Sequence, residues 1–209
     1  MRIGIVGAGE LGGALAELWV SAGHQVAIGD PGGSSASKDL VERLGSSARS
    51  TTIEDAARFG EVILLAVPFG APDSLPPALS VAGKIVIDAM NAISETGENM
   101  PLDGRASSDI VAERFPDARI VKAFNAILAD TIRSEGRLSV PADRRFVVFI
   151  AGDDGRSKAR VSTLIEEIGF TPIDTGSLAR GGRLQEPGSK LFNRPMLPAD
   201  ARHALQLFG

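Results

Sequence analysis

Residues 2–12 read RIGIVGAGELG, and this stretch decides the fold. Its first part, Arg2–Val6, is short, apolar and rich in β-branched residues, which indicates a buried strand. After the glycines, apolar residues recur at helical spacing from Leu11 to Trp19. The stretch therefore predicts a strand, a glycine-rich turn and a helix in direct succession.

The turn has the pattern G-x-G-x-x-G. Gly7 makes the tight turn, Gly9 lets the backbone approach a pyrophosphate, and Gly12 lets the helix pack closely on the strand. The N–H groups at the start of the helix favour an anion there. Glu10 suits a helix N-terminus but not a neighbouring pyrophosphate. The alternative is a glycine turn with a structural role only.

Further apolar runs follow at regular intervals along the chain. Their alternation with helical segments predicts an α/β fold, a doubly wound parallel sheet of the Rossmann type with right-handed crossovers. The predicted strands are 25–29, 61–67, 84–88, 118–122, 145–150 and 171–174, and the clearest later helices are about 39–44, 156–168 and 199–207.

The chain divides, on this interpretation, into two parts. Residues 1–140 form a dinucleotide-binding Rossmann domain, and residues 141–209 form a small C-terminal α/β lobe for substrate binding or dimerisation. The boundary is placed at Pro141, in a polar segment. Residues 176–198 are rich in Gly and Pro and are predicted to be a loop.

Composition removes several classes of function. The 209 residues carry 22 basic and 26 acidic side chains, a formal charge of −4 that gives no field for nucleic acid or an anionic membrane. There is no cysteine, which excludes disulfides, thiol nucleophiles and Cys-ligated metals. The chain has no tyrosine, which excludes acid–base chemistry by a tyrosine side chain. It has only two histidines, and we therefore predict no metal site. Without an apolar run of membrane length or a signal-peptide pattern, we expect a cytoplasmic protein.

Asp30 ends the second predicted strand, at the place where an acidic side chain accepts hydrogen bonds from an adenosine ribose. A carboxylate there repels a 2′-phosphate, so the residues favour NAD(H) over NADP(H). The alternative is that Asp30 only starts an Asp-Pro turn.

Ligands of such sheets bind outside the carboxyl ends of the strands. We expect Asn91, Lys122, Phe124 and Asn125 to surround a nicotinamide, with Lys122 and Asn125 polarising an acceptor carbonyl or orienting a carboxamide. The alternatives are a solvated strand-end charge for Lys122 and a core position for Phe124. Cofactor contacts are predicted at Val67, Pro68, Ala89 and Asn91, and substrate contacts at Lys122, Phe124 and Asn125.

The segments MRIGIVGAGELGGALAELWVSAGHQV, EVILLAVPFGA, KIVIDAMNAI, ARIVKAFNAI, FVVFIAGDD and EPGSKLFNRPML together resemble the NADP-dependent oxidoreductases of the coenzyme F420 type. The resemblance implies hydride transfer between the nicotinamide C4 and the C5 of a deazaflavin, with little need for protein acids or bases. It also implies that Ala8, Gly9, Glu10 and Leu11 line the pyrophosphate, that residue 30 meets the ribose, and that Val67 and Pro68 contact the middle of the cofactor.

One departure from this family concerns the end of the second strand, where its members carry Ser, Thr or Arg and this chain has Gly-Asp-Pro-Gly at 29–32. Either the coenzyme is NAD(H), or Lys38 or the hydroxyls of Ser34, Ser35 and Ser37 hold the 2′-phosphate of NADP(H). The small-molecule cosubstrate is coenzyme F420, a flavin, a quinone or another small oxidant. A homodimer is a family-level expectation, and no catalytic residue is assigned. The rival function is a non-catalytic NAD(P)-binding sensor or regulatory subunit.

Overall fold

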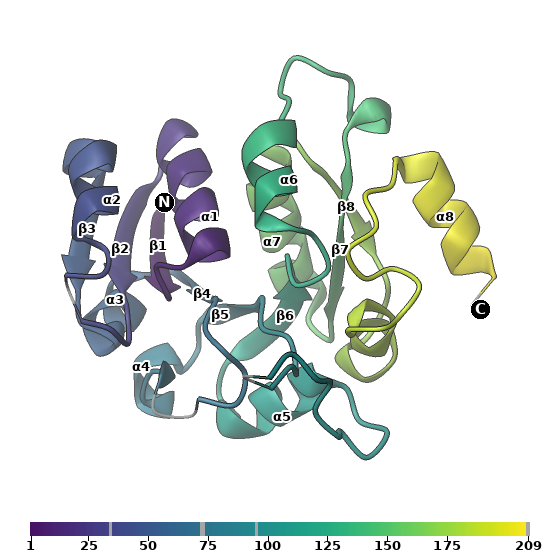
Figure 1. The fold of residues 1–209 in the computed structure, drawn as a ribbon, viewed down its shortest axis with the longest axis horizontal. Helices are drawn as coiled ribbons and strands as arrows, with labels where there is room; N and C mark the ends of the chain where they lie inside the picture. Colours follow the sequence, from purple (N-terminus) through teal and green to yellow (C-terminus); the bar gives the residue numbers. More distant parts are fainter. Residues whose placement is uncertain (34, 72–73, 95, 208–209) are drawn as a thin grey trace.

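The computed structural model describes residues 1–33, 35–71, 74–94 and 96–207. Its centre is an eight-stranded sheet with the order β3-β2-β1-β4-β5-β6-β7-β8 (Figure 1). All neighbouring strands are parallel except β6 and β7. This confirms the predicted α/β, Rossmann-like class. The strands are β1 Arg2–Val6, β2 Gln25–Gly29, β3 Ala48–Thr51, β4 Val62–Leu65, β5 Ile85–Asp88, β6 Arg119–Ala123, β7 Val147–Gly152 and β8 Thr171–Asp174.

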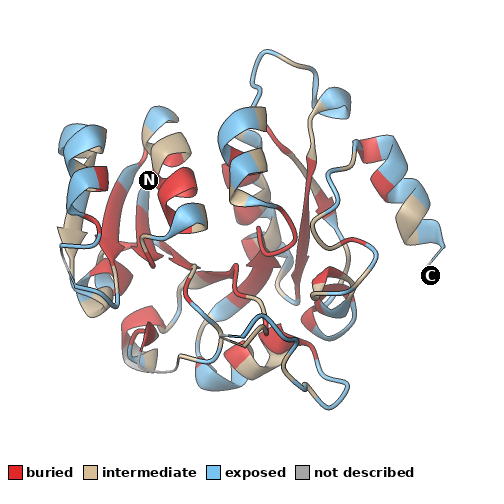
Figure 2. Ribbon diagram, in the orientation of Figure 1, coloured by how far each residue is buried: buried red, intermediate tan, exposed pale blue. Residues whose placement is uncertain are grey.

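Helices cover both faces of the sheet. Trp19 of α1, Ile132 of α6 and Leu164 of α7 share one core cluster, and Val81 of α4 and Val111 of α5 belong to a second. The inner strands are almost wholly buried (Figure 2), as the unbroken apolar runs of β1, β4 and β7 predicted, whereas the edge strands β3 and β8 are partly exposed. The helices are α1 Glu10–Ser21, α2 Lys38–Leu44, α3 Ile53–Phe59, α4 Ala78–Val81, α5 Ser107–Arg114, α6 Ala129–Glu135, α7 Gly155–Glu166 and α8 Pro198–Gln206.

The direction of β7 differs from the predicted parallel arrangement. Ala123 pairs with Ile150 and Val121 with Gly152, so β7 starts at the edge where β6 ends and runs back. An apolar strand has the same residue pattern in either direction, so the sequence cannot show this reversal. Both β7 and β8 belong to the same sheet as β1 to β6, and the division of the chain at residue 140 stays a prediction.

Local sequence signals explain several helix starts. Thr52 caps α3 by accepting from the Asp55 amide, and Asp154 caps α7 by accepting from Ser157. The hydrogen bonds from the Ser157 hydroxyl and amide hold the pKa of the Asp154 carboxyl below its ordinary value. Of the helices that the structure describes, none has the length and apolar character needed to cross a membrane.

Candidate functional site

The glycine turn after β1 has no room for side chains at two of its positions. Gly7 has a φ of 105°, and a Cβ there would lie 2.3 Å from the Ala66 carbonyl oxygen. A Cβ on Gly12 would lie 2.0 Å from the Gly7 carbonyl oxygen. Both distances are far below van der Waals contact, so the structure requires glycine at 7 and 12, as predicted from the motif.

Gly9 is different, because no atom lies within 4 Å of a Cβ built there. Gly9 is the N-cap of α1, and no side chain caps the helix. The first N–H groups of a helix have no intrahelical acceptor and carry a partial positive charge. The glycine at 9 therefore leaves open space beside a ready anion site, and the turn fits the pyrophosphate of a dinucleotide.

The charge of Glu10 is compensated from another helix. The Arg133 guanidinium of α6 lies 2.5 Å from the Glu10 carboxylate and also donates to the Glu10 carbonyl oxygen at 3.0 Å. The Glu10 side chain is 81% exposed, so solvent weakens the attraction between the two charges. Arg133 thus offsets the negative charge that makes Glu10 an awkward neighbour for a pyrophosphate.

Asp30 joins the end of β2 to the glycine turn. Its Oδ2 accepts from the Ala8 amide at 2.6 Å, and its Oδ1 accepts from the Gly32 amide at 2.8 Å. The second contact confirms the Asp-Pro turn role. Asp30 also lines a cleft of about 700 Å³, which is large enough for an adenosine. Other residues lining this cleft are Pro31, Thr52, Ile53, Ser74 and Leu75.

The structure places the alternative 2′-phosphate ligands as follows. Lys38 is exposed and its Nζ lies 3.9 Å from Glu42. Ser37 is buried, and its hydroxyl is hydrogen-bonded to the Ser50 hydroxyl at 2.7 Å. Ser34 lies outside the described residues. Of the candidates that the structure describes in this segment, Asp30 is the one that both accepts a hydrogen bond from the glycine turn and lines the cleft.

Val67 and Pro68 follow β4 beside the glycine turn. Val67 is buried, and its Cγ1 would lie 3.0 Å from a Cβ on Gly7, whereas Pro68 is exposed. Ala89 follows β5, is buried, and donates its amide to the Leu65 carbonyl oxygen at 3.1 Å. These positions border the carboxyl edge of the sheet, as expected. Their contacts with a cofactor stay predictions.

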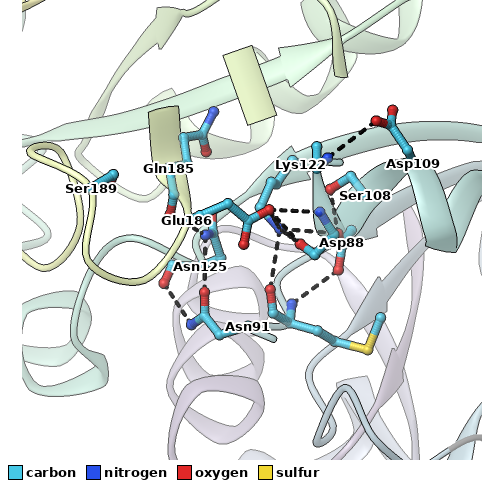
Figure 3. A network of polar contacts seen from close by, with 12 residues as sticks. Asp88, Asn91, Ser108, Asp109, Lys122, Asn125, Gln185, Glu186 and Ser189 are labelled. Atoms are coloured by element: carbon cyan, nitrogen blue, oxygen red, sulfur yellow. Dashed lines mark hydrogen bonds and ion pairs between the residues drawn. The ribbon is translucent and has the colours of Figure 1, made fainter. Parts of the chain in front are cut away.

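Lys122 requires a correction, because its side chain has no exposed area. Its Nζ has three acceptors: Asp88 Oδ2 at 3.2 Å, the Ser107 hydroxyl at 2.8 Å and the Met90 carbonyl oxygen at 3.3 Å (Figure 3). Ser108 also donates to Asp88, at 2.5 Å. The prediction that Lys122 touches a substrate carbonyl is wrong, and so is its alternative as a solvated charge. The ammonium group instead joins β5, β6 and α5 inside the protein.

Phe124 is also corrected. It is buried and packs edge-on against Trp19, with ring centroids 5.9 Å apart and an interplanar angle of 84°. It therefore occupies the core, which was the alternative, and is not a stacking platform for a substrate. Its φ of 65° is unusual for a bulky residue and lets the chain direct Phe124 into the core immediately before Asn125.

Asn91 and Asn125 form a reciprocal pair at the ends of β5 and β6. Asn91 Nδ2 donates to the Asn125 carbonyl oxygen at 2.9 Å, and Asn125 Nδ2 donates to Asn91 Oδ1 at 3.1 Å. Asn91 is half-buried and Asn125 is buried. The structure thus brings these two predicted residues together, with Asn91 the more accessible of them.

Gln185 and Glu186, which lie within the predicted loop, join the site although no sequence pattern indicated them. The segment forms a π-helical turn at Leu178–Gly182 and a 3₁₀ turn at Arg183–Gln185. The Gln185 carbonyl oxygen accepts from Asn125 Nδ2 at 2.8 Å, and Glu186 Oε1 accepts from the amide and hydroxyl of Ser107 at 2.8 and 2.7 Å (Figure 3). All these partners are at least 60 residues away in the chain, so no local pattern could reveal them.

Neither histidine belongs to this edge of the sheet. His24 precedes β2, at the opposite edge, where its ring lies 3.2 Å from the Met1 amino group and 2.9 Å from Glu167. His203 lies on α8. The described residues around the turn and the asparagine pair therefore offer hydrogen bonds and charge but no histidine.

Comparison with known proteins places the chain among oxidoreductases. The family model described as NADP oxidoreductase coenzyme F420-dependent matches residues 2–92. The metalloreductase STEAP3 of Rattus norvegicus is 35% identical over 180 residues, which are 85% of this chain and 34% of that protein. The chain thus spans about a third of the length of the curated relatives it matches.

Solved structures agree with the fold. A hypothetical protein from Sinorhizobium meliloti is 33% identical with a TM-score of 0.81, covering 94% of this chain and 95% of its own. A proposed F420-dependent NADP reductase from Arthrobacter sp. FB24 is 24% identical with a TM-score of 0.73, covering 100% and 90%. A reductive aminase from Aspergillus terreus in complex with NADPH is 20% identical with a TM-score of 0.62, covering 88% and 57%. The second and third likenesses concern the fold alone.

Proposed function

We propose that this chain, whose residues 2–92 match the family model described as NADP oxidoreductase coenzyme F420-dependent, transfers a hydride between a nicotinamide dinucleotide and a deazaflavin or flavin-like acceptor. The single observation that carries the proposal is the open space at Gly9, which adjoins the uncapped start of α1 and belongs to the same turn as Ala8, the amide partner of Asp30. A dinucleotide fits this arrangement with its pyrophosphate at the helix start and its adenosine in the cleft lined by Asp30.

The residues at the site suit chemistry that needs positioning more than acid–base catalysis. When bound, the nicotinamide supplies the hydride at C4, and proximity to a flat acceptor lowers the barrier. The chain contains no tyrosine, and the structure places both histidines away from the turn. The Lys122 ammonium is occupied by three internal acceptors. The role left for Asn91 is to hold and orient the rings, while the buried Asn125 fixes the position of the Asn91 side chain.

The choice of coenzyme depends on Asp30. We expect Asp30→Asn to shift the ratio of dissociation constants toward NADP(H) roughly tenfold, about 1.4 kcal/mol, because it removes the charge that repels a 2′-phosphate. The asparagine keeps an oxygen that can accept from the Ala8 amide. Calorimetric titration with NAD⁺ and NADP⁺ measures the ratio. Asp200→Asn, at an exposed acid on α8, controls for net charge. An unchanged ratio in Asp30→Asn would remove Asp30 from the ribose site.

The identity of the hydride acceptor is tested with a panel of candidate oxidants. Loss of reduced-nicotinamide absorbance is followed with coenzyme F420, FMN, FAD, a quinone and a ferric chelate, with NADH and NADPH as donors. We expect turnover with the deazaflavin or a flavin. The ferric chelate is included because the curated relatives are metalloreductases. Tight coenzyme binding without turnover with any of these acceptors would favour the sensor function instead.

A further inference from the structure

One ammonium and two carboxylates are gathered beside the Asn91–Asn125 pair. Lys122 and Asp88 are fully buried, and the Glu186 side chain is 13% exposed. The group adjoins the pair on both sides: Met90, whose carbonyl oxygen accepts from Lys122, precedes Asn91 in the chain, and Asn125 donates to the carbonyl oxygen of Gln185, which precedes Glu186. The charges therefore lie next to the predicted nicotinamide end of the site.

The charges in this group do not cancel, because two carboxylates face one ammonium. Asp88 is well compensated: it accepts from the Met90 amide at 3.1 Å, from Ser108 and from Lys122. Glu186 lies 4.0 Å from Lys122 and uses only Oε1, on Ser107. The excess formal negative charge is therefore centred on Glu186.

Three buried side-chain oxygen atoms of this group have no hydrogen-bond partner among the residues that the structure describes. They are Asn125 Oδ1, Gln185 Oε1 and Glu186 Oε2. All three are acceptors, and an unpaired buried acceptor costs free energy unless an electropositive group approaches. Their complement is a positively charged or hydrogen-donating ligand.

We propose that Glu186 is an electrostatic binding determinant that favours the oxidised, positively charged nicotinamide over the reduced, neutral ring. This inference rests on the proposed function. A buried charge is poorly screened, so it acts on a ring held beside the Asn91–Asn125 pair without touching it. The same charge favours hydride donation by the reduced coenzyme, because positive charge develops on the ring as the hydride leaves.

The test compares the two redox states of one coenzyme. The coenzyme pair used, NADH with NAD⁺ or NADPH with NADP⁺, is the one that the original protein binds more tightly. Binding of the reduced form is measured by fluorescence titration, and binding of the oxidised form by displacement of the reduced form. In Glu186→Gln, which keeps the side-chain shape, we expect the dissociation constant for the oxidised form to rise roughly tenfold and that for the reduced form to stay within about twofold. Glu186→Asp keeps the charge and should hold the ratio within about threefold of the original protein.

Glu113→Gln provides the control, because Glu113 is an exposed acid on α5 paired with Arg105. It should leave both constants unchanged. If Glu186→Gln weakens both redox states equally, or neither, the electrostatic role is overturned and Glu186 only anchors its segment. If the original protein binds neither NADPH nor NADP⁺, nor the NADH pair, the proposed function itself fails, which is a distinguishable result.

Discussion

Gly9→Val should bind the coenzyme roughly a hundredfold more weakly, about 2.7 kcal/mol, while folding normally. A side chain at 9 projects into the open space beside the first turn of α1, which is where the pyrophosphate is expected. The backbone at Gly9 has φ −66° and ψ −169°, which any residue adopts. We therefore expect the free energy of unfolding without coenzyme to change by no more than about 1 kcal/mol, the usual size of an N-cap effect.

Gly12→Ala provides the contrast within the same turn. Its Cβ would lie 2.0 Å from the Gly7 carbonyl oxygen, so the added methyl forces helix and strand apart. We expect a loss of about 1–3 kcal/mol of stability even without coenzyme. Denaturant unfolding and calorimetric titration of both variants separate the two effects. Unimpaired coenzyme binding in Gly9→Val would place the pyrophosphate elsewhere and undermine the proposed function.

Lys122→Met should destabilise the protein by about 3–5 kcal/mol, because it leaves Asp88 and Glu186 buried without their ammonium partner. The loss is measured by urea unfolding. Lys158→Met is the matched control: its partner Asp174 lies 2.7 Å away but is 49% exposed, and such pairs contribute about 0–1 kcal/mol.

The double variant Lys122→Met with Asp88→Asn separates charge from packing. Removing the second charge should recover part of the loss, since the stranded carboxylate causes most of it. A single variant that loses less than about 1 kcal/mol would show that water or a rearrangement reaches the buried group. That result would also weaken the electrostatic argument for Glu186.

Much of the site was predictable because its signals are local. The glycine turn depends on residues within one strand–helix unit, and Asp30 directly follows the next strand, β2. The apolar runs of β1, β4 and β7 are buried as their patterns indicated. Lys122 and Phe124 were misjudged because a strand-end position does not show what covers it.

The sequence by itself determined the class of sheet, the position of the glycine turn and the resemblance to a reductase family. It could do so because short-range spacing and hydrophobic periodicity control strands, helices and tight turns. Only the tertiary structure decided the reversed direction of β7, the burial of Lys122 and the position of Glu186 near Lys122 and Asn125. Those features arise from contacts between distant segments, where burial and charge compensation act on side chains whose neighbours the local pattern does not contain.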